Sequence, residues 1–335
     1  MPPSLAVRLG SLGLKNPVVC ASGEWTMTGE GLRAALAAGA AAVVAKSTNE
    51  SEAAKRQLEA AAYVLLDEEW RPAERATRHT SLFNRSGLVG DPFEAWVATL
   101  ADADREARSR DAYVVASLIP AAADELPALA RAFEDAGLRW LELNLGASHA
   151  EEAAPGAIEL AGDAERVEDL VSRVRTATGM HLTVKLPGSG DVLGLVGAAV
   201  EAGADSVALV GRPLGFLPDL ETRRPYLGTF GAIGGAWALP LTLRWVVKAR
   251  ARFGPDVPLL ATNGVRDGRD VARALLAGAT AAELGTAVWT DGPGALARAR
   301  DGLAAYLDEQ GVSAQSIVGE AADAVMTYEE AGRQR

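Results

Sequence analysis

The chain has 335 residues, of which 49% are apolar and only 5% aromatic, and it contains 35 glycines. Its formal net charge of −11 argues against nucleic acid or an anionic membrane as a partner. The single cysteine, Cys20, excludes an internal disulfide and cysteine-ligated metal sites, and we expect no bound metal. No apolar run approaches the roughly 20 residues of a membrane span. The first residues, Met1–Ser4, lack a secretory signal, so we expect a cytoplasmic protein.

Short apolar runs alternate with longer stretches of helical period along the whole chain. Near-continuous apolar runs of this kind are typical of parallel strands that are buried on both faces. Eight such units predict an α/β fold, a (β/α)8 TIM barrel, with an open doubly wound sheet as the alternative. In chain order the runs are Pro17–Ala21, Ala41–Ala45, Tyr113–Ser117, Trp140–Leu145, His181–Leu186, Ser206–Val210, Pro258–Thr262 and Ala281–Leu284.

An Ala-Gly phrase recurs just before four of these runs, at Gly39, Gly137, Gly203 and Gly278. Glycine at this place is typical of a helix that ends and turns into the next strand. The recurrence therefore indicates one repeated strand–helix unit.

Two connections between the predicted strands are long, over residues 46–112 and 210–257. Both start at the C-terminal end of a strand, where barrel enzymes build their active sites. Because the composition does not shift along the chain, we predict a single domain over residues 1–335, with long insertions at the C-terminal face of the strands.

Glycine turns follow the last two predicted strands, at Asn263-Gly264 and at Gly285-Thr286. In barrels these two loops form the usual phosphate site, where backbone N–H groups hold the anion. A third glycine-rich loop ends in Gly234-Gly235, before a predicted helix at Leu239–Ala249. The two loops after the last strands together predict a phosphate-bearing ligand, whereas the third loop is either part of the cofactor site or a flexible connector.

Two of the five lysines, Lys46 and Lys185, stand at the ends of apolar strands. A compact ammonium there could stabilise negative charge on a reduced flavin or on a substrate oxyanion. Polar residues also end strands at Ser22 and Asn144, and the segment Asn84–Leu88 carries a further amide and hydroxyl.

These motifs resemble the dihydroorotate dehydrogenase family, specifically its soluble cytosolic class, from Leu14 to about Gly319. The resemblance implies FMN, a small-molecule substrate, oxidation or reduction of a CH–CH bond, and a homodimer. The cofactor-binding residues that it implies are Ala21, Ser22, Gly23, Lys46, Ser47, Asn144, Lys185, Gly234, Gly235, Asn263, Gly264, Gly285 and Thr286. The substrate-binding residues that it implies are Lys46, Asn84, Ser86, Gly87, Leu88, Asn144, His149, Val210 and Gly211.

The chain departs from the family pattern where the chemistry takes place. The family's catalytic loop, Asn-x-Ser-Cys-Pro-Asn, corresponds to Asn144–His149, which puts Ala147 at the position of the base. A substrate-binding Asn becomes His149, and a later Asn-Ser pair becomes Val210-Gly211. Since buried polar atoms of a substrate that lose their partners cost about 1–3 kcal/mol each, we expect a substrate other than orotate, such as one of specialised metabolism.

We assign Lys185 to charge stabilisation and either His149 or Ser148 to proton transfer. Three alternatives stay open: a genuine dihydroorotate dehydrogenase with its base relocated to His149 or Ser148, a flavin-binding protein without turnover, and a barrel that binds a sugar phosphate. Val210, Trp25 and Phe216 are candidates for an apolar pocket lining.

Overall fold

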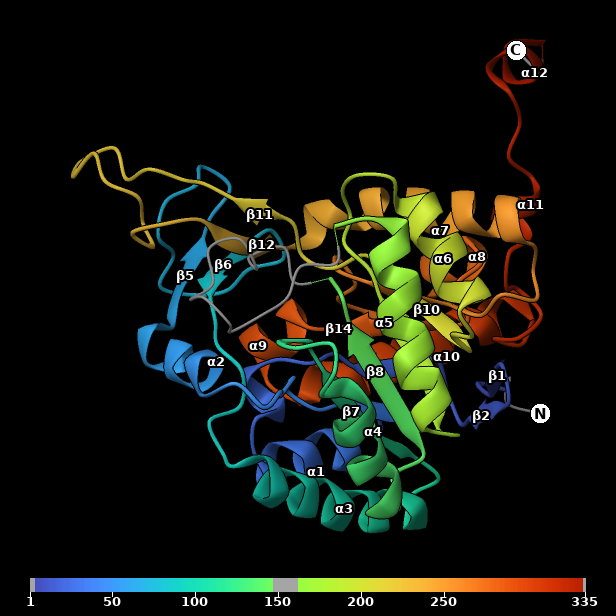
Figure 1. Cartoon of the computed structure of the whole chain (residues 1–335). Helices are drawn as coiled ribbons and strands as arrows, with labels where there is room; N and C mark the ends of the chain where they lie inside the picture. The colour runs from blue at the N-terminus through green and yellow to red at the C-terminus, as the bar shows by residue number, and fades with distance from the viewer. Residues whose placement is uncertain (1–3, 147–161, 334–335) are drawn as a thin grey trace.

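The computed structural model describes residues 4–146 and 162–333 and contains a closed barrel of parallel strands (Figure 1). The strands follow one another around the barrel in the order β10-β13-β14-β3-β4-β7-β8-β9, which confirms the predicted (β/α)8 fold. Each of the eight predicted runs coincides with a strand of this barrel, and β7 extends one residue beyond its run. Their bounds are β3 Val18–Cys20, β4 Ala42–Val44, β7 Tyr113–Leu118, β8 Trp140–Asn144, β9 His181–Lys185, β10 Ser206–Leu209, β13 Leu259–Thr262 and β14 Ala281–Leu284.

Helices surround the barrel and share one apolar core with it (Figure 1). Several begin at a side-chain cap, as where Asp163 accepts from the Arg166 N–H and Asp267 accepts from the Asp270 N–H. No helix of the described residues is both long and apolar enough to cross a membrane. The helices of the outer layer are α1 Gly29–Ala37, α3 Phe93–Ser109, α4 Leu126–Asp135, α5 Ala164–Ala177, α6 Val192–Glu201, α7 Leu239–Phe253, α8 Gly268–Leu276 and α10 Gly294–Gln310.

The four Ala-Gly phrases form the helix-to-strand turns that the sequence predicts. Each glycine has a positive φ, from +91° at Gly137 to +103° at Gly278. Each follows the C-terminus of a helix, namely α1, α4, α6 and α8. A left-handed residue at this place ends the helix and directs the chain into the next strand.

The two long connections pair with each other in a second sheet, of order β11-β12-β6-β5. Its strands are β5 Ala62–Leu66, β6 Ser81–Arg85, β11 Leu214–Gly215 and β12 Gly231–Gly234, and Figure 1 shows them together beside the barrel. Leu66, Phe83 and Leu227 form a small apolar cluster of their own at this sheet. The remaining short elements are β1 Val7–Leu9, β2 Leu12–Leu14, η1 Glu24–Thr26, α2 Glu52–Arg56, η2 Gln57–Ala60, η3 Ala236–Ala238, α9 Thr286–Asp291, α11 Glu320–Asp323 and α12 Tyr328–Arg333.

Polar side chains on neighbouring barrel strands bond one another at buried positions. Trp140 Nε1 donates to Thr183 Oγ1 at 2.7 Å, and Ser206 Oγ lies 2.7 Å from Thr183 Oγ1 and 3.0 Å from His181 Nε2. Burial lowers the pKa of His181 to about 4, so the imidazole is neutral at physiological pH. These contacts give His181 a structural place between β9 and β10.

Helices α8 and α10 approach each other closely at Gly268 and Gly302. A substitution at this contact tests the packing of the outer layer. A Cβ at Gly268 would overlap the backbone of Gly302 and Leu303. We expect Gly268→Ala to lower the free energy of unfolding by about 1–3 kcal/mol, measured by urea denaturation, because the helices must move apart.

Gly302→Ala is the matched control, because a Cβ there would lie 3.5 Å from Gly268 Cα, an ordinary contact. That variant should be neutral or slightly stabilising, since alanine favours a helix over glycine by about 1 kcal/mol. Equal losses in both variants would contradict the assigned contact.

Candidate functional site

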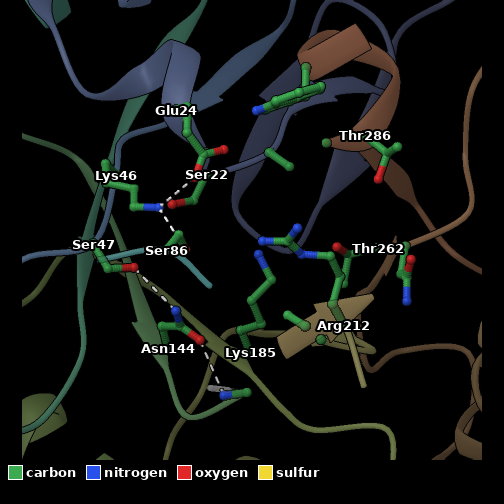
Figure 2. A pocket seen from close by; sticks show the side chains of 18 of the residues that line it. Ser22, Glu24, Lys46, Ser47, Ser86, Asn144, Lys185, Arg212, Thr262 and Thr286 are labelled. Atoms are coloured by element: carbon green, nitrogen blue, oxygen red, sulfur yellow. Dashed lines mark hydrogen bonds and ion pairs between the residues drawn. The ribbon is translucent and has the colours of Figure 1, made fainter. Parts of the chain in front are cut away.

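A cavity opens at the C-terminal ends of the barrel strands, with residues of β6 and β12 on its other side. Figure 2 shows Lys185 and Arg212 reaching into it, with Lys46 on its wall. The predicted cofactor and substrate residues that line this cavity are Ala21, Ser22, Gly23, Lys46, Ser47, Ser86, Gly87, Leu88, Asn144, Lys185, Gly211, Asn263, Gly264, Gly285 and Thr286.

Other predicted residues lie behind the wall that the described residues form. Asn84 is buried on β6 and contacts the cavity only through Arg212. Val210 is buried and faces Gly188, where an added Cβ would lie 3.1 Å from Val210 Cγ2. Of the apolar candidates, Trp25 lines the cavity, whereas Phe216 is exposed and packs on Phe230. Ser148 and His149, like Ala147, lie outside the described residues.

Lys46 ties together two side chains on one side of the cavity. Its Nζ donates to Glu24 Oε1 at 3.2 Å and to Ser86 Oγ at 3.4 Å (Figure 2). The Tyr63 hydroxyl donates to the same Glu24 oxygen at 3.0 Å. Although burial opposes ionisation, Lys46 and Arg212 hold the pKa of Glu24 below its usual value. Glu24 is therefore a carboxylate at neutral pH, held by two donors.

Arg212 follows β10 and brings a second cation to the same side. Its Nη1 donates to Oδ1 of Asn84. The Asn84 Nδ2 is buried and has no hydrogen-bond partner among the described residues. Burial lowers the pKa of Arg212, and Glu24 partly offsets this effect. Because arginine stays protonated in proteins, this wall carries Arg212, Lys46 and Glu24 as three charged groups.

Lys185 lies at the floor of the cavity between two buried carboxylates. Its Nζ donates to Glu142 Oε2 at 3.1 Å and to Glu283 Oε2 at 2.8 Å. Although burial opposes the charged form, the two carboxylates raise the pKa of Lys185, so the ammonium persists. Burial also raises the pKa of Glu142 despite the nearby Lys185. We name Glu142, Lys185 and Glu283 the barrel triad.

A chain of hydrogen bonds joins the barrel triad to the cavity wall. Ser117 Oγ donates to Glu142 Oε1 at 3.0 Å, and Ser47 Oγ lies 2.9 Å from Ser117 Oγ. Asn144 Nδ2 donates to Ser47 Oγ at 3.1 Å, while Asn144 Oδ1 accepts from the Gly146 N–H (Figure 2). Asn144 and Lys185, two of the strand-end residues that the sequence singles out, are thus held in one network with Ser47.

Three glycine-containing turns meet beside one end of the cavity, although Gly234 and Gly235 themselves do not line it. A Cβ at Gly234 would lie 2.9 Å from Arg212 Cδ, 3.0 Å from Thr286 Oγ1 and 3.2 Å from Asn263 Oδ1. Asn263 Oδ1 is buried without a hydrogen-bond partner among the described residues. The turns after β12, β13 and β14 therefore come together although they are far apart in the sequence. No group of three or more His, Cys, Asp or Glu within residues 4–146 and 162–333 is arranged to hold a metal ion.

Sequence reasoning missed Glu24, Arg212 and both carboxylates of the barrel triad. Glu142 and Glu283 each interrupt an apolar strand, which is a signal that an inward-facing charge has a partner. Arg212 stands two residues beyond the predicted strand end at Val210, and Glu24 directly follows the predicted Gly23. No comparable signal in the sequence marks Glu24 or Arg212 as a site residue.

A family model described as dihydroorotate dehydrogenase matches residues 4–307. The chain is 30% identical over 322 residues to the catalytic subunit of dihydroorotate dehydrogenase B (NAD(+)) of Pyrococcus furiosus, covering 94% of this chain and 98% of that relative. It is 31% identical over 318 residues to the protein of the same name in Pyrococcus abyssi, covering 94% and 98%. It is 29% identical over 324 residues to the putative dihydroorotate dehydrogenase A (fumarate) of Solibacter usitatus, covering 95% and 99%.

The barrel triad makes a prediction about stability. Lys185→Met leaves Glu142 and Glu283 facing each other in the barrel without their shared cation. We expect a loss of about 3–5 kcal/mol in the free energy of unfolding, measured by urea denaturation. Removing one partner of a buried ion pair leaves the remaining charge buried without compensation. Adding Glu283→Gln to this variant should restore part of the loss.

Lys55→Met serves as the control, because Lys55 pairs with Glu52, whose side chain is 70% exposed. Exposed pairs contribute about 0–1 kcal/mol, so this variant should remain close to wild type. A similar, small loss for both lysine variants would show that the barrel triad does not hold the charge described.

Proposed function

The chain belongs to the dihydroorotate dehydrogenase family, and from this premise we propose an FMN-dependent oxidoreductase whose substrate is a small molecule other than dihydroorotate. The family match confirms the resemblance found in the motifs. The chain is thus a flavin-dependent oxidoreductase that acts on CH–CH bonds. One observation carries the choice of cofactor: the glycine-containing turns after β13 and β14 line the same cavity as the Lys185 ammonium, and Gly234 lies against them.

The chemistry of the three turns fits FMN. Backbone N–H groups of Gly264 and Gly285 and the Thr286 hydroxyl are donors that suit a phosphate. The unpartnered Asn263 Oδ1 is an acceptor and suits a ribityl hydroxyl better than a phosphate oxygen. Gly234 leaves room for the ligand, because a side chain there would meet Thr286 and Asn263. These residues would hold the phosphate end.

Bound FMN would supply the site that accepts or returns a hydride. The chain's own part begins with Lys185, whose ammonium would face the negative charge that the ring gains on reduction. Ser47 and Asn144, held by the hydrogen bonds described above, would position the cofactor at the floor of the cavity. Lys46, Ser86 and Arg212 would orient the substrate on the opposite wall.

The charged wall supports a substrate other than dihydroorotate. Asn84, one of the two amides that this chain retains of the four in the family pattern for a pyrimidine dione, is buried and has its carbonyl held by Arg212. Glu24 presents a carboxylate to the cavity and would accept hydrogen bonds from a substrate. The wall therefore suits a molecule that carries both a donor for Glu24 and an anionic or acceptor group for Arg212 and Lys46.

The proton-transferring residue and the assembly complete the proposal. We assign proton transfer to His149 or Ser148, which follow Ala147 in the sequence. The relatives from Pyrococcus are named catalytic subunits of NAD(+)-linked enzymes. For this chain we propose a cytoplasmic homodimer that passes electrons to a separate partner.

The cofactor proposal predicts the effect of closing the phosphate end. Gly234→Ala should weaken FMN binding about tenfold or more, which equals about 1.4 kcal/mol, because the methyl group occupies the space between Thr286 and Asn263. The measurement is titration of the apoprotein with FMN, followed by quenching of flavin fluorescence. Gly215→Ala is the control in the same small sheet, since its Cβ would lie 3.4 Å from Ile233. Unchanged FMN affinity in both variants would refute the assignment.

The substrate proposal predicts how the flavin absorbance responds to dihydroorotate. When dihydroorotate is added anaerobically to the FMN-loaded protein, the flavin absorbance band should persist. Bleaching within the mixing time would identify dihydroorotate as the substrate and favour a relocated base at His149 or Ser148. His149→Ala should then abolish that bleaching if His149 is the base.

A further inference from the structure

The barrel triad places two buried carboxyl groups directly behind a lysine of the proposed flavin site. It contains one ammonium and two carboxyl groups, and Lys185 alone of the three lines the cavity. Figure 2 shows the Lys185 side chain directed into the cavity. The two carboxyl groups therefore lie on the side of Lys185 away from the ligand.

Stability alone does not account for this arrangement. The side chains of Glu142 and Glu283 are each 1% exposed. Glu283 Oε1 has no hydrogen-bond partner among the described residues, whereas Glu142 Oε1 accepts from Ser117. Two buried carboxyl groups around one cation are harder to stabilise than apolar side chains of the same size. The excess carboxylate therefore points to a role toward the ligand.

The carboxylates lie close enough to act on anything in contact with Lys185. Glu283 Oε2 is 2.8 Å and Glu142 Oε2 is 3.1 Å from Lys185 Nζ. Because these side chains are buried, charges at such distances are weakly screened. A ring in front of Nζ would feel the ammonium together with the negative charge behind it, and so less net positive potential than an unpaired lysine provides.

We propose that Glu283 and Glu142 set the reduction potential of the bound flavin by offsetting the charge of Lys185. The two carboxylates make the flavin harder to reduce than it would be beside a lysine without partners. This inference rests on the proposed FMN site. Glu283 and Glu142 are positioning residues here, because they act through Lys185 and not on the ligand directly.

Glu283→Gln separates charge from geometry. The amide keeps the shape of the side chain and an oxygen that accepts from Lys185, and its NH2 group replaces an oxygen without a described partner. The reduction potential of the FMN-loaded protein is measured anaerobically against a reference dye. We expect the ratio of reduced to oxidised flavin at a fixed ambient potential to rise about tenfold, a shift of about 30 mV for a two-electron couple.

Two further variants complete the experiment. Glu142→Gln should shift the potential in the same direction, and it carries the test if Glu283→Gln does not fold. Asp104→Asn is the matched control, because Asp104 is a buried carboxylate between Arg139 and Arg108, outside the lining of the cavity. Its removal should leave the potential at the wild-type value.

The outcomes distinguish the inference from the function on which it rests. If wild-type protein binds no FMN, the proposed cofactor is wrong and the inference falls with it. If FMN binds at full stoichiometry and the potentials of Glu283→Gln and Glu142→Gln equal that of wild type, the inference is overturned while the proposed cofactor stands. A shift of equal size in Asp104→Asn would also overturn it.

Discussion

Lys185 can stay charged inside the barrel because carboxylates from two other strands reach it. Glu142 comes from β8, next to β9, whereas Glu283 comes from β14, which β10 and β13 separate from β9. The triad thus spans the interior of the barrel and depends on its closure. The triad in turn fixes the register of the three strands, because a shift of any strand by one residue would turn its charged side chain to the other face. The polar strand ends around it take their positions from the same registers.

This arrangement gives the floor and the opposite wall of the cavity different electrostatic potentials. The floor has the barrel triad, where one cation is outnumbered by carboxyl groups, and the opposite wall has Lys46 and Arg212 around Glu24. An anionic group in the cavity is attracted to the wall more than to the floor. We infer that the cavity orients a ligand pair, with the redox group at the floor and the charged part of the substrate at the wall.

The sequence was sufficient for the barrel but only partly for the site. Strand positions follow from local apolar runs, and their ends carry Lys46 and Lys185, so a linear pattern predicts them. The partners of these lysines are set by contacts between distant segments. Lys185 meets Glu283 from 98 residues away, and Asn84 meets Arg212 from 128 residues away. Such pairs depend on barrel closure and on the pairing of the two insertions, which no local period encodes.

One departure from the family pattern has a physical reason in the fold. Gly211 stands where the family pattern has the second residue of its Asn-Ser pair, and a Cβ at that position would lie 2.7 Å from the carbonyl oxygen of Gly146. The backbone of Gly146, two residues beyond the end of β8, therefore occupies space that a side chain at position 211 would need. A serine at position 211 would require the backbone at Gly146 to move, so the glycine and the path of this backbone depend on each other.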